Sequence, residues 1–377
     1  MKINGVNLGN WLVLEKWMNP AMFEGTDAED ETYLAEKLSP EAYKARIKLH
    51  RAEYITERDF LRIRAMGFNT VRIPVPFYIF GDRKPFIGCI EELDNAFTWA
   101  ENYNLKILID LHTAPESQNG FDNGGLCGIV KWATLPDEVE FVFTVLKRLA
   151  ERYGKRKGLF GIELLNEPLT PEMFGYMNVA SIYKPVDKER AKGTCPVEWD
   201  FLEDFYTKAY DLITPFMAED KYVVLQDGFD LLHWKNFMQE PKYKNVIIDT
   251  HNYLNTMEYL DIDKSLEGHK QFIKDWFEKK FVEMTKYHKV ICGEWCLNNM
   301  LTTKLYNENK ELLEIDDEEK RKIYREIAKA QLDVWEKGEG HFYWSYKLLI
   351  DSANAPDAKA KEPWDLDRCV NYGWYPL

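Results

Sequence analysis

Two glutamates in this sequence follow apolar runs in which an ionisable side chain is unexpected. Glu167 lies in the stretch Leu-Phe-Gly-Ile-Glu-Leu-Leu-Asn-Glu-Pro-Leu at 159–169, and Glu294 follows Val-Ile-Cys-Gly at 290–293. A carboxylate at the end of a buried strand costs free energy unless a site uses it. Two carboxylates without metal-ligand spacing around them are typical of glycoside hydrolysis. The simpler alternative for Glu167 alone is a strand-end side chain that turns out to solvent.

The separation of such a pair decides the stereochemistry of the reaction. Retaining glycosidases hold the two carboxyl groups about 5–5.5 Å apart. One attacks the anomeric carbon, while the other protonates the leaving oxygen and then deprotonates water. Inverting enzymes need roughly 6.5–9.5 Å, because a water molecule lies between the groups. The residue types alone leave both outcomes open.

Other polar residues near the predicted strand ends are expected to assist the two glutamates. The charge of Arg72 is expected to hold Glu294 ionised, whereas a general acid must stay protonated near neutral pH. Asn166 directly precedes Glu167. In an extended strand it therefore points to the opposite face, and it needs a bulge or turn to reach a sugar hydroxyl.

Two histidines, His112 and His251, also follow predicted strands. They are expected to orient the carboxylates or the substrate, although a single histidine is more often structural. A metal site built from both histidines and the carboxylates is the sharper alternative. The positive charge of Arg72 in the same set disfavours a bound cation.

The elements that position these residues form a repeating pattern of short apolar runs and amphipathic segments. Apolar runs predict strands at 3–8, 68–74, 105–111, 159–169, 221–226, 245–250, 290–293 and 341–346. Helical spacing of apolar residues predicts helices at 54–66, 93–104, 137–153, 198–217, 266–287 and 316–337. Two polar stretches, 18–50 and 170–197, are expected to be insertions.

Eight strands alternating with helices predict an α/β fold, a single (β/α)8 TIM barrel with long βα loops. Because no linker rich in Pro, Ser or Gly interrupts the pattern, residues 1–377 are expected to form one catalytic domain. Barrel enzymes build their sites at the carboxyl ends of the strands. The polar and aromatic residues at or just past those ends are Arg72, His112, Asn166, Glu167, His251, Tyr253, Glu294 and Trp344.

The composition limits the classes of partner. The formal net charge of −14 disfavours nucleic acid or an anionic membrane, since both select basic surfaces. The 12 Trp and 21 Tyr exceed what an aliphatic core requires and offer flat faces for sugar rings, although most are expected to be core residues. No cofactor is expected.

The same sequence predicts a cytoplasmic location. Its first residues, Met-Lys-Ile-Asn-Gly-Val-Asn-Leu, include no basic segment followed by an apolar stretch, and no run is long enough to span a membrane. The six cysteines include no Cys-x-x-Cys pair, which is compatible with free thiols in a reducing compartment. A secreted chain from which an export signal has been removed is the alternative.

The residues at the strand ends resemble those of glycoside hydrolase family 5. The matching motifs are Asn-Thr-Val-Arg-Ile-Pro, Asp-Leu-His, Leu-Leu-Asn-Glu-Pro, Asp-Thr-His-Asn-Tyr, Gly-Glu-Trp and Phe-Tyr-Trp-Ser-Tyr-Lys. The resemblance implies that Glu167 is the acid/base, that Glu294 is the nucleophile and that the configuration is retained. The supporting residues that it implies are Arg72, His112, Asn166, His251 and Tyr253.

Within that family the chain is most similar to exo-β-1,3-glucanases of the fungal type, through residues 5–17 and 110–123. The residues that this likeness places at the substrate are Glu15, Phe121, Asp122, Asn123 and Trp344. It implies that two acids, Glu15 and Asp122, hold hydroxyls of the terminal glucose and that Phe121 stacks on the next sugar. Without the resemblance, Glu15 is interpreted as a loop acid and Phe121 as a loop anchor.

The resemblance also implies a cis peptide bond between Trp344 and Ser345, which turns the indole under the first glucose. Two segments, 170–197 and 297–315, look unlike the fungal enzymes and border the distal subsites. The fungal enzymes are also secreted and disulfide-bonded. The resemblance therefore supports the catalytic residues better than the substrate.

These features favour a retaining β-glucosidase or exo-β-glucanase that acts on short β-glucans or β-glucosides. Glu15 follows Gly9 by six residues and Asp122 follows His112 by ten. Both loops are expected to reach over the barrel mouth and to close a pocket around the terminal glucose, which excludes a chain that continues through O4.

Three alternative functions remain open. An endo-β-1,4-glucanase would place the same strand-end residues in an open cleft. A 6-phospho-β-glucosidase would need a basic residue near O6, for which Lys16 and Lys347 are the candidates. A sugar-binding module without catalysis is disfavoured, because both Glu167 and Glu294 are present.

Overall fold

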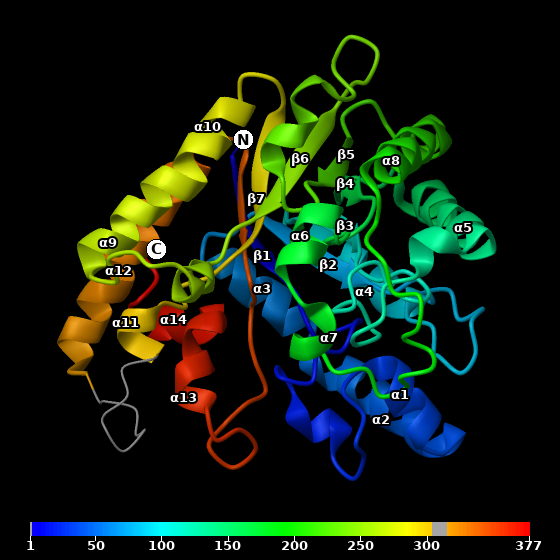
Figure 1. The fold of residues 1–377 in the computed structure, drawn as a ribbon, viewed down its shortest axis with the longest axis horizontal. Helices are drawn as coiled ribbons and strands as arrows, with labels where there is room; N and C mark the ends of the chain where they lie inside the picture. The colour runs from blue at the N-terminus through cyan, green and yellow to red at the C-terminus, as the bar shows by residue number, and fades with distance from the viewer. Residues whose placement is uncertain (1, 304–314) are drawn as a thin grey trace.

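Eight parallel strands close into a barrel in the computed structural model, which describes residues 2–303 and 315–377 apart from the side chain of Ala180. The strands pair in sequence order, and β8 pairs with β1 to complete the barrel (Figure 1). Their bounds are β1 Ile3–Asn7, β2 Thr70–Val75, β3 Lys106–Leu111, β4 Leu159–Glu163, β5 Tyr222–Gln226, β6 Val246–His251, β7 Lys289–Trp295 and β8 Gly340–Tyr343. The predicted α/β barrel is confirmed.

Helices surround the barrel and bury their apolar faces against the strands. The main ones are α3 Glu57–Ala65, α4 Ile90–Asn102, α5 Pro136–Tyr153, α8 Trp199–Ile213, α9 Leu266–Phe272, α10 Lys279–Met284 and α12 Asp317–Trp335. Phe60 and Ile63 of α3 belong to the same buried core as Val71 and Ile73 of β2. Full burial of each such side chain contributes about 1.5–3 kcal/mol to the free energy of folding. In Figure 1, α5 and α8 lie on one side of the barrel and α9, α10 and α12 on the other.

The insertion at 18–50 is largely helical. It holds α1 Glu31–Lys37 and most of α2 Pro40–Tyr54, so the helix predicted at 54–66 begins only at Glu57. The helical spacing of Tyr43 and Ile47 on α2 supplies a second buried core, separate from that of the barrel. Thr56 caps the start of α3, because the backbone N–H groups of Thr56 and Asp59 each bond to the side chain of the other residue in a capping box.

Shorter elements follow several strands at the mouth of the barrel. They are α6 Pro171–Tyr176, α7 Val179–Ile182, α11 Met300–Thr303, α13 Ala358–Lys361 and α14 Leu366–Asn371. Short 3-10 helices are η1 Pro20–Phe23, η2 Trp132–Thr134, η3 Thr214–Phe216, η4 Leu231–Asn236, η5 Leu254–Tyr259 and η7 Glu362–Trp364. The π-helical turn η6 Ile273–Glu278 lies between α9 and α10.

The polar segment 170–197 thus contains two short helices, α6 and α7. Most of the segment 297–315 falls on 304–314, outside the described residues. Among the helices that the structure describes, none has both the length and the apolar character needed to cross a bilayer.

Candidate active site

The inside of the barrel changes from apolar to charged toward the carboxyl ends of the strands. Successive side chains of a strand alternate in direction, so Ile247, Asp249 and His251 of β6 share one face. Ile247 belongs to a small apolar core inside the barrel, whereas Asp249 and His251 lie above it with their side chains buried. On β3, Leu108 belongs to the same apolar core, and the buried Asp110 and then His112 follow it at a spacing of two. The strand-end residues therefore rest on a buried layer of charged side chains.

Arg72 of β2 is the centre of that charged layer, and its side chain is fully buried. Its five N–H groups face five oxygen atoms: Glu163 Oε2 at 2.7 Å, Glu294 Oε1 at 2.9 Å, Asn166 Oδ1 at 2.9 Å, Asn7 Oδ1 at 3.0 Å and Asp110 Oδ2 at 3.1 Å. Burial alone would lower the pKa of Arg72, but the surrounding carboxylates hold it well above its ordinary value. Arg72 is therefore a permanent positive charge that fixes the groups above it.

Glu294 of β7 is held by donors on both carboxylate oxygens. Arg72 Nη1 donates to Oε1, and the hydroxyl of Tyr253 donates to Oε2 at 2.7 Å. The pKa of Glu294 is raised, because burial and the nearby charge of Glu167 outweigh the charges of His251 and Arg72. The two donors act against that rise, since each favours the ionised and fixed carboxylate that a nucleophile requires.

The residue before Glu294 must be a glycine. A Cβ atom on Gly293 would lie 1.8 Å from Asp249 Oδ2. The missing side chain lets Asp249 accept a hydrogen bond from the backbone N–H of Gly293. Substitution at this position would displace either Asp249 or the strand that carries Glu294.

Glu167 lies beyond the regular end of β4 in a backbone conformation that L-residues rarely adopt. The β4 ladder ends at Glu163, and φ of Glu167 is +45°. Such a conformation costs about 1–3 kcal/mol and persists where surrounding contacts enforce it. The turn brings Asn166 and Glu167 into the same site, although neighbours in an extended strand point to opposite faces.

Two side chains hold the Glu167 carboxylate. His251 Nδ1 donates to Oε1 at 2.7 Å, and Asn123 Nδ2 donates to Oε2 at 2.9 Å. Burial raises the pKa of Glu167, but the hydrogen bond and charge of His251 outweigh it, so the pKa is lowered. Burial lowers the pKa of His251, but the carboxylates Glu294, Asp249 and Glu167 hold it well above the usual range. The proton of this pair therefore resides on His251 in the free protein.

Oxygen atoms of the two glutamates lie close together in the site. One carboxylate oxygen of each and a ring nitrogen of His251 all lie within 4.8 Å of one another. An inverting mechanism needs roughly 6.5–9.5 Å, so the spacing matches retention. These three groups are one of two sets of possible metal ligands among the described residues, and Glu163, Asp249 and His251 are the other. Arg72 contacts one member of each set, Glu294 at 2.9 Å and Glu163 at 2.7 Å, and its positive charge would repel a metal ion.

His112 does not share this cluster. Its Nδ1 faces Asp110 Oδ2 at 2.5 Å and its Nε2 lies 3.5 Å from Asn166 Nδ2. Its ring stacks on the indole of Trp344, with centroids 5.7 Å apart and planes at 5°. His112 therefore orients Asn166 and Trp344. Neither of its ring nitrogens bonds to Glu167 or Glu294.

Trp344 is buried at the end of β8. Its peptide bond to Ser345 is cis, which confirms that prediction. Gly9 leaves room for the indole, because a Cβ atom there would lie 2.9 Å from the ring. The loop from β1 is thereby packed directly against this aromatic residue.

Two acids on separate loops lie close to each other beside Glu167 and Glu294. Glu15 is 4% exposed, and its Oε2 accepts a hydrogen bond from Trp17 Nε1 at 2.8 Å, while Oε1 has no protein partner. Burial and the charge of Asp122 raise the pKa of Glu15 well above its ordinary value. Burial also raises the pKa of Asp122 to about 6. A buried acceptor oxygen without a partner is suited to a ligand hydroxyl.

The aromatic residue next to this pair lies in a cluster of its own. Phe121 is 6% exposed, with ring centroids 5.3 Å from Tyr183 and 6.3 Å from Phe229. Its neighbour Asn123 points instead to Glu167. The loop 113–123 therefore supplies a hydrogen bond to Glu167 through Asn123 and an aromatic side chain, Phe121, beside the two acids.

The charged layer beneath the site was not predicted from the sequence. Its members are Asn7, Asp110, Glu163 and Asp249, all buried. The signal was present, because a single acid inside an apolar strand run, as in Ile-Asp-Leu or Ile-Glu-Leu, is costly without a partner. Trp17 and Gln118 were also missed; Gln118 Nε2 donates to the carbonyl oxygens of His112 and Asn166 at 2.9 and 2.8 Å.

Comparisons with known proteins agree with this geometry. A family described as cellulase (glycosyl hydrolase family 5) matches residues 41–348. A glucan 1,3-β-glucosidase of Candida oleophila is 30% identical over 416 residues, which cover 100% of this chain and 88% of that protein. One of Lachancea kluyveri is 29% identical over 418 residues, covering 99% and 86%. A crystal structure of rutinosidase from Aspergillus niger has the same fold, with a TM-score of 0.75 and 21% identity over 100% of this chain and 98% of that one.

The comparisons contradict the predicted cytoplasmic location. The relatives are fungal glucan 1,3-β-glucosidases, which points to an extracellular location. The prediction relied on the first residues of the sequence and on free cysteines. All six cysteines are indeed unpaired in the structure, but unpaired thiols do not decide the compartment in which a protein acts.

Proposed function

The chain belongs to glycosyl hydrolase family 5, and from this membership we propose that it is a retaining, exo-acting β-glucosidase that releases glucose from β-1,3-linked glucans and short β-glucosides. The observation that carries the proposal is the pair Glu167 and Glu294 within 4.8 Å, each held by its own set of donors. The substrate is a β-linked gluco-oligosaccharide or glucan, and residues 1–377 act as one catalytic domain.

The reaction proceeds by double displacement. A Glu294 oxygen attacks the anomeric carbon while the bond to the leaving oxygen breaks, and Glu167 gives its proton to that oxygen. The product is a covalent ester between glucose and Glu294. Glu167, now ionised, removes a proton from water, whose oxygen attacks the anomeric carbon and frees Glu294. Two inversions leave the released glucose in the β configuration.

The surroundings of the two glutamates support this division of roles. Glu294 contacts a permanent cation, Arg72, and a phenol, Tyr253, so its negative charge is stabilised in place. Glu167 contacts His251, from which it can receive a proton across 2.7 Å. An acid/base must gain and lose a proton in each cycle. The donor at Glu167 is a histidine, which exchanges a proton far more readily near neutral pH than the phenol and the guanidinium that contact Glu294.

The two loop acids support exo-action. The unpartnered oxygen of Glu15 and the carboxylate of Asp122 are the acceptors available to hydroxyls of a terminal glucose. Acceptors built for free hydroxyls reject a sugar whose O4 carries a further residue. The names of the curated relatives support β-1,3 linkages.

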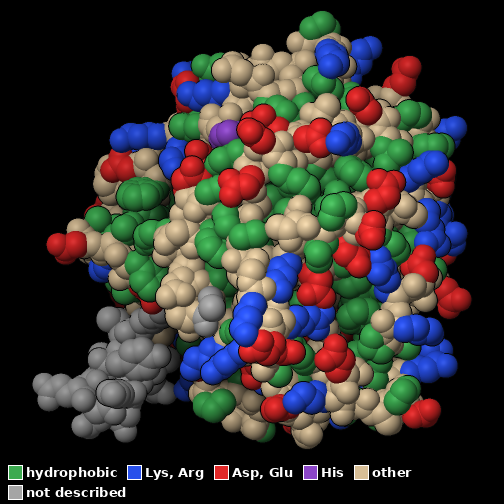
Figure 2. Space-filling model, turned by 45° about the vertical axis from the view of Figure 1, so that its right-hand side comes forward, with side chains coloured by type: hydrophobic (Ala, Val, Ile, Leu, Met, Phe, Trp, Pro, Cys, Tyr) green, Lys and Arg blue, Asp and Glu red, His purple; other side chains and the backbone are tan. Residues whose placement is uncertain are grey.

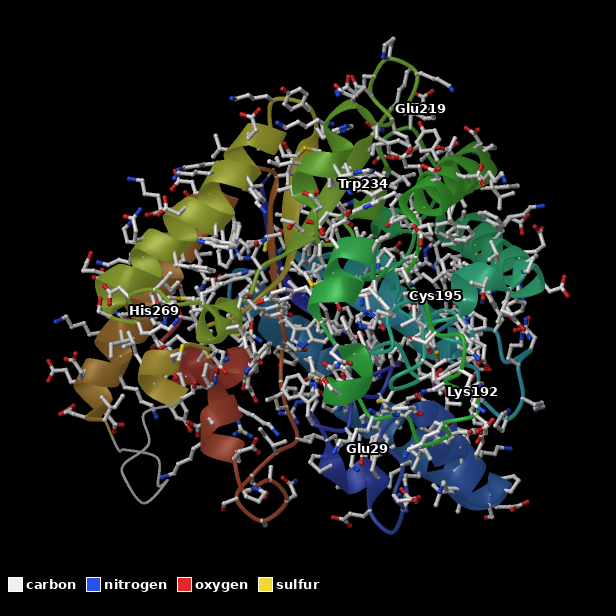
Figure 3. The ribbon with its side chains drawn as sticks, viewed as in Figure 1. Glu29, Lys192, Cys195, Glu219, Trp234 and His269 are labelled. Atoms are coloured by element: carbon white, nitrogen blue, oxygen red, sulfur yellow. The ribbon has the colours of Figure 1, made fainter. Side chains whose placement is uncertain are left out.

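The two lysines that a 6-phospho-β-glucosidase could use near O6 are both paired with acids of the chain. Lys16 pairs with Glu29 at 2.8 Å, near the start of α1 (Figure 3). Lys347 pairs with Asp59 at 2.8 Å. The buried acids Glu15 and Asp122 would also repel a phosphate. On the face that Figure 2 shows, basic side chains lie among acidic ones rather than in one patch, an arrangement that offers no extended surface for a polyanion.

A panel of substrates tests the proposal. We expect glucose release from β-1,3-linked oligosaccharides and from aryl β-glucosides, with β-glucose as the first anomer seen by NMR. Soluble β-glucan should lose little viscosity while glucose accumulates. Rapid viscosity loss with oligosaccharide products would identify an endo-acting enzyme, and activity restricted to phosphorylated disaccharides would overturn the assignment.

A further inference from the structure

One tryptophan lies on the surface, away from the active site. Of the tryptophans in this chain, all within the described residues, only Trp276 is exposed, at 46%. It lies in the π-helical turn η6, and its ring stacks on Phe272 with centroids 5.4 Å apart and planes at 20°. Phe272 covers one face of the indole and fixes its orientation. The remaining exposed surface of the ring is therefore a rigid aromatic platform.

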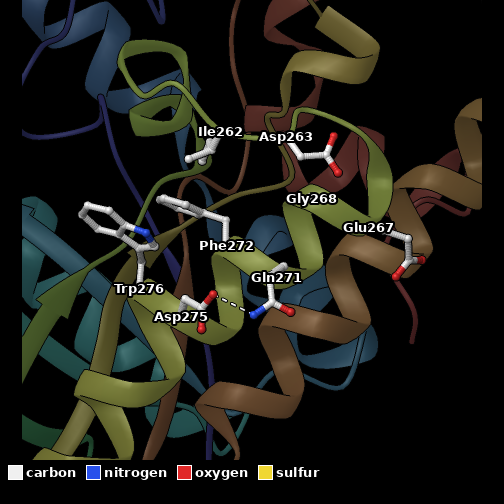
Figure 4. Close-up of a pocket in the computed structure, with 8 residues that line it drawn as sticks. All are labelled: Ile262, Asp263, Glu267, Gly268, Gln271, Phe272, Asp275 and Trp276. Carbon is white, nitrogen blue, oxygen red and sulfur yellow. Dashed lines mark hydrogen bonds between the residues drawn. The ribbon is translucent and has the colours of Figure 1, made fainter.

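A shallow pocket surrounds this platform (Figure 4). Its lining residues are Ile262, Asp263, Glu267, Gly268, Gln271, Phe272, Asp275 and Trp276. Gln271 Nε2 donates to Asp275 Oδ2 at 2.7 Å, so the two polar groups next to the indole hold each other in place. None of these eight residues is basic, and three are acidic, which disfavours an anionic ligand.

The pocket belongs to the same chain segment as a residue of the active site. Tyr253, whose hydroxyl donates to Glu294, begins the segment that leads through η5 to Ile262 and then to α9. Because α9 follows β6, its first turn starts at the carboxyl-end face of the barrel, where the active site lies. Tyr259 on this segment is 75% exposed and adds a further aromatic ring. The end of the pocket formed by Asp263 and Glu267, at the start of α9, therefore lies at the rim of that face, and Trp276 follows about 15 Å along the same helix.

We propose that the pocket around Trp276 is a second carbohydrate site that binds an internal segment of a β-glucan chain. The inference rests on the proposed function, since it takes the polymer as the substrate. A glucose ring is apolar on its faces and hydroxylated at its edge. Its face packs on the indole while Gln271 and Asp275 accept hydrogen bonds from the hydroxyls. Binding at the rim raises the concentration of chain ends near the catalytic pocket.

The test separates internal binding from binding of chain ends. A long soluble β-1,3-glucan has few ends per unit mass, so retardation in a gel that contains it reports mainly on internal segments. In the Glu294→Ala background, which does not digest the polymer, Trp276→Ala should raise the dissociation constant roughly 3- to 10-fold, the size of one lost aromatic contact. Tyr287→Ala is the matched control, because Tyr287 is 40% exposed and precedes the amino end of β7, at the opposite end of the barrel.

Activity gives a second readout in the chain that retains Glu294. Trp276→Ala should lower kcat/KM for the long glucan by a similar factor and leave kcat/KM for an aryl β-glucoside unchanged. Equal retardation of Trp276→Ala and the control would overturn the inference. A wild-type dimer that Trp276→Ala converts to a monomer, with glucan binding unchanged, would show a contact between two copies and overturn it as well. Failure of the proposed function has a different signature, namely no glucose release from β-glucan by the wild type.

Discussion

His251 Nδ1 donates a hydrogen bond of 2.7 Å to Glu167 Oε1, so an imidazole and the carboxylate that we propose as the acid/base share one proton. The pKa of Glu167 is lowered and that of His251 is raised well above its usual range. Before the chemical step the proton must pass to Glu167. The pair therefore has to carry one proton for catalysis, and activity is lost as the pH rises far enough to remove it.

Glu167→Gln tests the acid role. Gln cannot give a proton, so the variant should lose far more activity on glucosides with poor leaving groups than on activated aryl glucosides, which depart without protonation. The alkaline limb of the pH–activity profile should also disappear, because it reports the proton of the pair. Equal loss on both substrate classes, with the alkaline limb intact, would count against this role.

Glu163→Gln tests the charge of the layer beneath the site. Burial raises the pKa of Glu163 well above its ordinary value, and the charges of Asp110 and Asp249 add to the shift, although Arg72 at 2.7 Å opposes it. The raised pKa favours the protonated form of Glu163, and Gln has the same shape without a charge. We expect kcat/KM within about threefold of the wild type, whereas Glu163→Leu should lose most activity because Arg72 then lacks a buried acceptor. A Gln variant with an unchanged Tm but a large loss of kcat/KM would show that the negative charge is needed.

Glu15→Gln tests the pocket for the terminal glucose. Gln replaces one of the two oxygens of Glu15, the partner of Trp17 Nε1 or the unpartnered one, with an NH2 group that cannot accept a hydrogen bond. A buried donor left without its acceptor costs about 1–3 kcal/mol, so kcat/KM should fall roughly 10- to 100-fold. Glu29→Gln is a suitable control, because Glu29 is an exposed acid on the same part of the chain that pairs with Lys16. Normal kinetics for Glu15→Gln would favour an open cleft and an endo-acting enzyme.

Glucose binding should depend on pH through Asp122. Burial raises its pKa to about 6, so the carboxylate gains a proton as the pH falls through 6 and becomes a weaker acceptor for a hydroxyl. The dissociation constant for glucose, measured by calorimetry, should therefore rise between pH 7 and pH 5. Asp122→Asn should bind glucose weakly at both pH values. A wild-type dissociation constant that does not change over this range would contradict a role for the ionised carboxylate.

Much of the site could be predicted because strand ends follow from the pattern of the sequence. Apolar runs place Arg72, Glu167 and Glu294 near one end of the barrel, and that prediction does not depend on the exact residue at which each strand ends. The left-handed backbone at Glu167 could not be predicted, since the contacts of its side chain enforce it. The exposure of Trp276 could not be predicted either, because a tryptophan at helical spacing is ordinarily part of the core.

The charged layer inside the barrel was accessible in principle. Asp110 and Asp249 each stand two residues before a histidine of the site, and a period of two places them on the same face. The partner that makes such burial tolerable, Arg72, comes from another strand. Which strands face one another across the barrel is a property of its closure, and a single strand does not contain that information.

The central claim is that Glu294 is the nucleophile of a retaining β-glucosidase, and chemical rescue tests it most directly. Glu294→Gly should abolish turnover, and azide should restore activity on an activated aryl β-glucoside by attacking from the side that the carboxylate leaves vacant. The account predicts α-glucosyl azide as the product. A β-glucosyl azide would show that Glu294 is the acid/base and would reverse the roles of Glu167 and Glu294.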